Sequence, residues 1–319
     1  MHYKTICLSI TDKCTAECEF CGLSCCPDND NVMDPSFMER IIREAKKIGI
    51  KKIGFSGGEP FLFPDLLLQG TRIAKEEDLD VNIATNGFWG SWDDDRIVDY
   101  LKELSPKSIS FSYDKFHQQF IPEDDFFHAV SHVYGRRIDC TIAVADMTGE
   151  DGAGRFLKSL GKKVLTKEYN LYPAYRVGRA KNLPEEMFFT FSDRTNIVCL
   201  YEGILSVMYN GDVYPCCRHQ SFDSAIKLGN ALDSDLAELI KKSDVAMICE
   251  TLMNSERFNC LLETAESLGI SVPKEVGCSC DFCRALFGTE ENMKKMLPAV
   301  KDLYGRMLVR SLMKEANVE

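Results

Sequence analysis

The chain has 319 residues, of which 45% are hydrophobic and 27% charged, and its formal net charge is −11. This length is sufficient for one large α/β domain with a smaller domain beside it. The acidic balance argues against nucleic acid as a main partner, because phosphate binding depends on clustered Lys and Arg. No apolar run approaches the length of a membrane span, and no signal peptide is visible, so we expect a cytoplasmic protein with no membrane partner. In that compartment the 15 cysteines indicate metal ligands or catalytic thiols rather than disulfides.

Strand and helix signals alternate along the first half of the chain. Apolar runs predict strands at residues 4–10, 52–56, 81–85, 108–112, 138–144 and 163–171. Helical spacing predicts helices at residues 35–48, 64–79, 93–104, 124–134 and 151–160. Asp34 and Pro35 read as the N-cap and first position of the first helix. Repeated βα units predict parallel strands with right-handed crossovers, in a partial (β/α)6 or a full barrel with its chemistry at the carboxyl ends of the strands.

The pattern changes after residue 172. An ordered loop is expected at 173–180, and apolar residues around Asn210-Gly211 predict a hairpin whose register places Cys216 opposite Leu205. Helical signals follow at 231–268 and from about 290 to 312. The predicted parts are a barrel domain, a small domain for an auxiliary cluster and a terminal helix that packs on the barrel: 1–195, 196–288 and 289–319.

Three cysteines, Cys14, Cys18 and Cys21, stand in the loop after the first predicted strand with the spacing C-x3-C-x2-C. Three thiolates hold only three corners of a four-iron cluster, so one iron remains open to a ligand that is not protein. On spacing alone, a zinc site or a set of buried thiols is the alternative. The pattern resembles the signature of radical S-adenosylmethionine (SAM) enzymes, in which SAM binds the open iron, and Phe20 matches their aromatic residue between the last two cysteines.

Further candidates for SAM binding stand at the ends of the next predicted strands. Gly57 and Gly58 let a ligand approach the backbone closely, and Glu59 offers an acceptor for an ammonium group. The resemblance to radical SAM enzymes implies additional contacts to SAM, at positions that can equally be turn residues or helix caps. These positions are Asn86, Ser112, Asp114 and Arg179.

A second group of cysteines occupies the C-terminal third of the chain. Its first part has the spacing C-x11-G-x4-C around Gly211, which resembles the SPASM/twitch extension with its auxiliary iron–sulfur cluster. The four expected ligands of one auxiliary [4Fe–4S] cluster are Cys199, Cys216, Cys280 and Cys283. Cys278 is a rival for the third position, and a structural zinc ion on the same thiols is the alternative.

Cys217 follows an expected cluster ligand directly. Neighbouring side chains of an extended segment face opposite sides, so we expect the Cys217 thiol to point away from the auxiliary cluster and into the barrel mouth. A thiol there can donate a hydrogen atom to a substrate radical. A small buried side chain with no role in chemistry is the alternative.

Four segments narrow the resemblance to the radical SAM peptide epimerases of epipeptide biosynthesis: 86–90, 112–117, 214–217 and 280–283. In that family a deoxyadenosyl radical removes the Cα hydrogen of an L-residue in a ribosomal peptide, and the second Cys of a Cys-Cys pair returns hydrogen to the other face. The resemblance implies that Cys217 is this donor. It also implies a ribosomal precursor peptide as substrate and an external electron donor of the flavodoxin or ferredoxin type. Cys25, Cys26 and Arg218-His219 depart from the family pattern, so the peptide is not identified.

Two alternatives to an epimerase stay open. A thioether or carbon–carbon cyclase acting on a similar peptide would use the same cofactors and return no hydrogen. A non-catalytic iron–sulfur or zinc protein that binds a partner peptide has no need of the open iron that Gly57, Gly58 and Glu59 indicate. His117 and His219 could contact the substrate, but they are interpreted as solvated or core side chains. Four other cysteines are interpreted as packing residues: Cys7, Cys140, Cys249 and Cys260.

Overall fold

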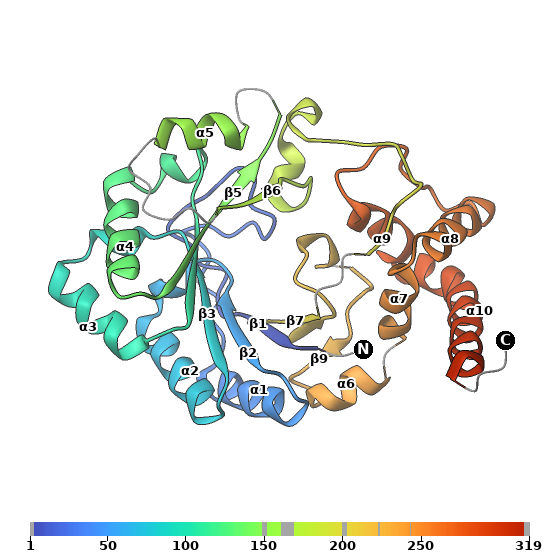
Figure 1. Ribbon diagram of the computed structural model, residues 1–319, viewed down its shortest axis with the longest axis horizontal. Helices are drawn as coiled ribbons and strands as arrows, with labels where there is room; N and C mark the ends of the chain where they lie inside the picture. The colour runs from blue at the N-terminus through green and yellow to red at the C-terminus, as the bar shows by residue number, and fades with distance from the viewer. Residues whose placement is uncertain are drawn as a thin grey trace.

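The computed structural model describes residues 3–148, 152–160, 169–199, 203–222, 224–242 and 244–315. A single nine-stranded sheet forms its centre, in the order β6-β5-β4-β3-β2-β1-β7-β8-β9 (Figure 1). The first six strands all pair in parallel and follow chain order across the sheet. They are β1 (Thr5–Ser9), β2 (Lys52–Ser56), β3 (Asp80–Thr85), β4 (Ser108–Ser112), β5 (Asp139–Asp146) and β6 (Tyr169–Pro173).

Five helices alternate with these strands and cover the outer side of the curved sheet (Figure 1). They are α1 (Pro35–Lys47), α2 (Pro64–Glu76), α3 (Asp94–Leu104), α4 (Glu123–Gly135) and α5 (Ala153–Leu160). The predicted alternation of strands and helices, and with it the partial barrel, is confirmed. Two predicted elements extend beyond the described residues, since 151 and 163–168 are not among them.

Helix α1 shows how the sequence specifies these elements. The Asp34 carboxylate accepts hydrogen bonds from the backbone N–H groups of Ser36 and Phe37, at 2.9 and 3.0 Å. These bonds satisfy donors that have no partner inside the helix, and Pro35 lacks such a donor altogether. Apolar residues at helical spacing then lie fully buried against the sheet, so capping and packing favour the same helix.

The inner side of the sheet is lined by small residues. Along β2 the large residues Ile53 and Phe55 are fully buried in the main hydrophobic core, while Gly54 and Ser56 alternate with them. Successive side chains of a strand point to opposite faces, so the helices contact the large side chains and the barrel interior receives the small ones. This alternation leaves space at the barrel mouth.

The C-terminal part extends the same sheet instead of forming a separate one. Strand β7 (Ile204–Met208) pairs in parallel with β1, and β8 (Asp212–Tyr214) and β9 (Gly229–Asn230) add antiparallel strands at the edge. The hairpin pairs Ser206 with Tyr214, and β8 ends there, so the expected pairing of Cys216 with Leu205 is wrong. Three residues, 209–211, connect the strands instead of two, and this shifts the register by one. The domain boundary at 195/196 stays a prediction.

The first of the remaining helices packs on α1, and the later ones form a separate layer beside the barrel (Figure 1). They are α6 (Leu236–Lys242), α7 (Val245–Leu252), α8 (Ser255–Ser267), α9 (Ser279–Phe287) and α10 (Glu290–Glu315). Helix α9 was not predicted from the sequence; its N-terminus has a reciprocal capping interaction between Cys278 and Asp281. No helix in the described part of the chain combines the length and apolar character that a membrane crossing requires.

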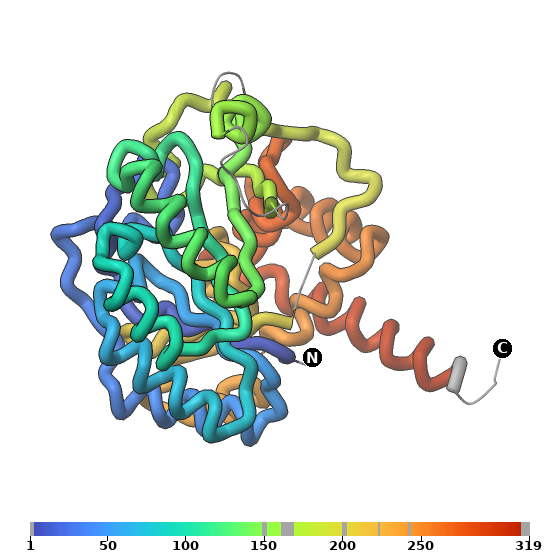
Figure 2. Tube along the Cα trace, turned by 60° about the vertical axis from the view of Figure 1, so that its left-hand side comes forward, coloured from blue at the N-terminus to red at the C-terminus, as the bar shows by residue number. Residues whose placement is uncertain are grey.

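The expectation that the terminal helix packs on the barrel is wrong. Helix α10 packs on α7, α8 and α9, because its buried residues Met296 and Val300 belong to the apolar core that these helices share. Its C-terminal end extends away from the rest of the molecule, where Leu308, Val309 and Leu312 are exposed (Figure 2).

A close backbone contact joins the 3-10 helix η2 (Phe88–Ser91) to α4. A Cβ atom at Gly90 would overlap the backbone carbonyl oxygen of Asp125, whereas a Cβ at Gly135 would meet no atom within 4 Å. We therefore predict that Gly90→Ala lowers the free energy of unfolding by about 1–3 kcal/mol, the usual cost of overpacking. Gly135→Ala is the matched control and should leave stability unchanged or raise it by about 0.5 kcal/mol.

Chemical denaturation of the anaerobically purified, cluster-loaded protein measures this difference. Equal stability of the two variants would contradict the proposed η2–α4 contact.

Candidate functional site

A cavity of about 350 Å³, here called the cofactor cavity, opens at the carboxyl ends of the parallel strands. Its strand-derived lining consists of small residues at or next to the strand ends, including Ser56, Ala84 and Ser112. Many of the predicted site residues line this cavity: Cys14, Cys18, Phe20, Cys21, Gly57, Gly58, Asn86, Ser112 and Cys217. Three of the residues predicted to bind SAM do not line it: Glu59, Asp114 and Arg179.

The loop that holds Cys14, Cys18 and Cys21, here called the three-cysteine loop, is fixed by its own backbone and by Arg179. The Cys14 N–H donates to the Cys26 carbonyl at 3.1 Å. Arg179 Nε donates to the Cys18 carbonyl at 3.1 Å, and its Nη2 donates to the Cys25 carbonyl. The guanidinium group therefore holds the loop in place, instead of facing the cavity as expected for a contact to the SAM carboxylate.

The thiols of this loop differ in acidity. A hydrogen bond from the Cys25 thiol lowers the pKa of Cys21 to about 6, which favours its thiolate. Burial raises the pKa of Cys14 to about 12, and the nearby Glu59 carboxylate adds to this rise. Cys25, which departs from the family pattern, thus has a defined role here as a hydrogen-bond donor to a predicted cluster ligand.

The thiols of the described residues do not form the compact group that a single zinc ion requires. Zinc bonds of ~2.3 Å hold four thiolate sulfurs within about 4 Å of one another. Among the described residues, no three cysteine sulfurs all lie within 4.8 Å of one another. A four-iron cluster places each thiolate on a different iron, so it accepts wider separations, and three thiols leave one iron for SAM. The cofactor cavity has the size of a small-molecule site.

Glu59 connects the end of β2 to the end of β3. Its buried carboxylate accepts hydrogen bonds from Asn86 N at 2.7 Å, Thr85 Oγ1 at 2.8 Å and Phe61 N at 3.0 Å. Burial raises the pKa of Glu59 to about 7, although these bonds lower it. The carboxylate is thus already used by protein donors, which differs from the expected role as acceptor for the SAM ammonium group.

The two glycines before Glu59 allow the three-cysteine loop to approach β2. Gly57 has a φ of 126°, and Cβ atoms at Gly57 and Gly58 would overlap the carbonyl oxygens of Thr11 and Lys13. Gly58 N donates to the Thr11 carbonyl at 2.7 Å. Both glycines also line the cofactor cavity, so their small size serves the loop contact and leaves space for a ligand.

Asn86, at the end of β3, contacts the three-cysteine loop directly. Its Nδ2 donates to Thr15 Oγ1 at 2.9 Å and lies 3.7 Å from Cys14 Sγ. Phe20, from the same loop, has its ring 5.1 Å from the ring of Phe116. These contacts bring the loop, β3 and the segment after β4 together around one cavity.

His117 is a residue of this cavity whose role the sequence analysis missed. It is 7% exposed, lines the cavity and has Nδ1 2.9 Å from the buried carboxylate of Asp114. Burial lowers the pKa of His117, but Asp114 and Cys18 raise it well above its usual value. The spacing Asp-x-x-His, directly after a strand end, was a signal that the two side chains could pair. Asp114 therefore positions His117 instead of facing the cavity itself.

A second, smaller cavity of about 80 Å³ brings the C-terminal cysteines together. Its lining includes all four expected auxiliary ligands: Cys199, Cys216, Cys280 and Cys283. Cys278 and Cys249 also line it. A hydrogen bond from Cys280 lowers the pKa of Cys278, so the two rival thiols are direct neighbours. The interpretation of Cys249 as a packing residue is incomplete, because burial and the nearby thiols of this group together raise its pKa.

Cys217 lies between the two cavities and lines both of them. Tyr175, Arg218 and Gln220 do so as well, and the four residues form a wall, here called the shared wall. Cys7 is also close to this wall, since burial and then Cys217 raise its pKa to about 12. The sequence placed Cys7 on a strand but gave no sign of this neighbour, because the two residues are far apart in the chain.

Comparison with known proteins agrees with this geometry. Residues 8–147 match the radical SAM superfamily, and residues 199–265 match SPASM, an iron–sulfur cluster-binding domain. The putative peptide biosynthesis protein YydG of Bacillus subtilis (strain 168) is 24% identical, over 95% of this chain and 98% of its own. A probable GTP 3',8-cyclase of Methanosarcina mazei is 44% identical, but over only 19% of this chain and 20% of its own.

Solved structures show the same fold at low sequence identity. The anSMEcpe protein with bound AdoMet has a TM-score of 0.60 at 13% identity, covering 94% of this chain and 99% of that chain. SuiB of Streptococcus suis, bound to its precursor peptide SuiA, has a TM-score of 0.57 at 14% identity, covering 82% and 73%. Residues 8–147 therefore form a radical SAM domain, whose cofactors are a [4Fe–4S] cluster and SAM, and residues 199–265 form a SPASM domain for auxiliary iron–sulfur.

Proposed function

We propose that the protein is a peptide epimerase that converts an L-residue of a ribosomally made precursor peptide into its D form. The observation that carries this proposal is the place of Cys217 in the shared wall, with the cofactor cavity on one side and the auxiliary cysteines on the other. The end-to-end similarity to a protein named for peptide biosynthesis supports a peptide substrate.

The proposed reaction removes and returns one hydrogen atom. When bound at the three-cysteine loop, the cluster and SAM supply a radical that removes a hydrogen atom from an α-carbon. Cys217 lines the same cavity as Cys14, Cys18 and Cys21 but comes from the shared wall, and we propose that it gives its S–H hydrogen to the other face of that carbon. The new C–H bond inverts the residue. The Cys217 sulfur then regains one electron from an external donor of the flavodoxin or ferredoxin type and one proton from solvent.

We assign two kinds of role to the predicted SAM-binding residues. Five line the cavity and are proposed to contact SAM: Phe20, Gly57, Gly58, Asn86 and Ser112. Glu59, Asp114 and Arg179 are proposed to hold these contacts in position, because their polar groups already bind protein donors and acceptors.

We predict that epimerisation in deuterated water adds one deuterium to an α-carbon of the product, because the Cys217 thiol exchanges its hydrogen with solvent. The net hydrogen count of the peptide should not change. Mass spectrometry and chiral amino-acid analysis, after anaerobic reaction of the cluster-loaded enzyme with SAM and the precursor peptide, measure both quantities. A product lighter by two hydrogens would replace epimerisation by cyclisation.

We predict that Cys217→Ala still cleaves SAM to deoxyadenosine and yields no D-residue above background, because the substrate radical then lacks its hydrogen donor. Cys217→Ser tests the same step with nearly the same side-chain volume and should behave alike. Cys260→Ala, which removes an exposed thiol on α8, is the control and should epimerise normally. Normal epimerisation by Cys217→Ala would exclude this thiol as the donor while leaving the cofactor assignments intact.

We further predict that Cys283→Ala loses auxiliary iron, because Cys283 is proposed as a ligand in the second cavity and its loss leaves one iron of the cluster without a thiolate. Iron and sulfide content should fall by about one cluster per chain, while the EPR signal that responds to SAM persists. Cys249→Ala and Cys278→Ala, in the same cavity, should retain the iron. Loss of iron from Cys278→Ala, with retention by Cys280→Ala, would transfer the third ligand position to Cys278.

A further inference from the structure

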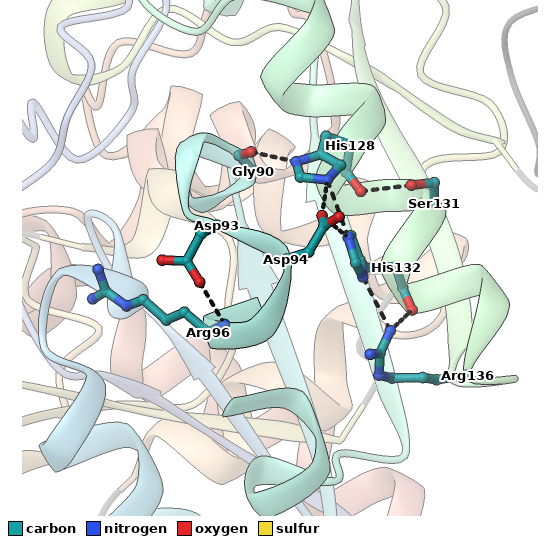
Figure 3. Close-up of polar contacts among 8 residues, drawn as sticks. All are labelled: Gly90, Asp93, Asp94, Arg96, His128, Ser131, His132 and Arg136. Atoms are coloured by element: carbon teal, nitrogen blue, oxygen red, sulfur yellow. Dashed lines mark hydrogen bonds and ion pairs between the residues drawn. The ribbon is translucent and has the colours of Figure 1, made fainter. Parts of the chain in front are cut away.

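A cluster of three potential metal ligands lies on the outer surface, apart from both groups of cysteines (Figure 3). Asp94 comes from the first turn of α3, and His128 and His132 come from α4. His128 Nε2 lies 2.7 Å and His132 Nε2 3.0 Å from the same oxygen, Asp94 Oδ1, and the two nitrogens are 3.1 Å apart. All three atoms thus converge on one point.

The local sequence explains why these three side chains meet. Residues four apart on a helix lie on the same face, so the spacing of His128 and His132 directs both rings to one side of α4. Gly90 allows η2 and α4 to approach closely, which brings the start of α3 within reach of the two rings. Asp93 caps α3 by accepting from Arg96 N at 2.9 Å, which leaves the neighbouring carboxylate of Asp94 to face the histidines (Figure 3).

When His128 is neutral, the polar hydrogen atoms of this cluster cannot pair all of its close contacts. His128 Nδ1 lies 2.6 Å from the Gly90 carbonyl oxygen, which can only accept, so Nδ1 carries the hydrogen. In the neutral ring Nε2 then has a lone pair, and it faces a lone pair of Asp94 Oδ1. A contact of 2.7 Å between two acceptors requires a positive charge between them, either a proton or a metal ion. The bond to Gly90 is also the kind of support that fixes the ring orientation of metal-binding histidines.

We propose that Asp94, His128 and His132 bind one divalent transition-metal ion. A triangle with these three edges allows an ion to lie at ~2.1 Å from every corner, the usual length of zinc bonds to histidine and carboxylate. Two imidazoles and one carboxylate form a donor set that suits Zn²⁺ and its first-row neighbours better than Mg²⁺ or Ca²⁺. The Asp94 side chain is 72% exposed, so water completes the coordination on the open side.

Arg136 is expected to weaken metal binding at this site. Its Nη1 lies 3.2 Å from His132 Nδ1 and donates to the His132 carbonyl at 2.8 Å. An ion on Nε2 moves the ring hydrogen of neutral His132 to Nδ1, where it meets this guanidinium donor. Removing the guanidinium group should therefore tighten metal binding.

The proposed ion joins two helices on the outer side of the sheet, and the first of them follows the cavity residue Asn86 in the chain. Its ligands connect the start of α3 to α4, and η2 lies between Asn86 and α3 in the chain. Asn86 contacts the three-cysteine loop, so the ion would stabilise the connection that holds this contact. The role is structural and needs no part in the radical chemistry.

Crystals of the cluster-loaded protein, grown anaerobically with zinc chloride, test the site directly. Anomalous difference maps on the two sides of the zinc absorption edge separate zinc from the iron of the clusters. We expect a zinc peak within bonding distance of Asp94 Oδ1, His128 Nε2 and His132 Nε2. An empty site at millimolar zinc, with the three atoms still in contact, would show that a proton holds them together and would overturn the proposal.

Calorimetric titration of the same cluster-loaded protein with zinc gives a second test. His132→Gln should lose one zinc equivalent, and Asp94→Asn serves as a second variant if the first fails to fold. Ser131→Ala, on the same helix and without a ligand atom in the cluster, should retain that equivalent. Arg136→Gln should lower the dissociation constant. Equal zinc binding by wild type and both ligand variants would place the zinc on other groups and refute the site.

Discussion

The positions of both cysteine groups depend on the pairing of strand β1 with a neighbour on each side. It pairs in parallel with β2 on one side and with β7 on the other, over all five of its residues. The three-cysteine loop leaves its carboxyl end, and the hairpin that precedes Cys216 and Cys217 lies at its side. A strand with neighbours on both sides has all its backbone groups satisfied and does not shift. The relative position of the two cavities is thus determined by two rows of backbone hydrogen bonds.

Several polar residues near the strand ends do not line the cofactor cavity. They hold the residues that do line it in position. Glu59, Asp114 and Arg179 were each expected to contact SAM, yet each binds protein groups that form the walls. A buried charge needs partners, and a carboxylate that accepts three hydrogen bonds cannot turn toward a ligand without leaving donors unsatisfied. At the ends of β2 and β4 the cavity surface is left to small residues, Ser56, Gly57, Gly58 and Ser112, which leave space for a ligand.

Much of the fold could be predicted from the sequence, because local periodicity decides it. The strands at 52–56 and 108–112 have the predicted bounds, and Asp34 caps α1 as expected. Non-local pairing could not be predicted: nothing in residues 204–208 indicates that they join β1. The hairpin register failed because Gly211, with φ 87°, closes a three-residue connection that Asn210-Gly211 alone does not distinguish from a two-residue turn. Cys249 was missed for the same reason, since only the fold gives it its neighbours, whereas the Asp-x-x-His spacing could have indicated the role of His117.

The shared wall contains a cysteine whose position differs from that of the other cysteines around the two cavities. Of the cysteines in the described part of the chain, Cys217 is the one that lines both cavities. The other thiols of the cofactor cavity belong to the loop of residues 14–25, and the other thiols of the second cavity surround the expected auxiliary site. A thiol that binds a metal is deprotonated and has no hydrogen to give, so the proposed donor has to be a cysteine outside both expected ligand sets, as Cys217 is. In the proposed epimerase, radical formation and hydrogen return therefore use separate sulfur groups of one cavity. This separation is what an inversion at carbon requires, because a single group that both took and returned the hydrogen would restore the original face.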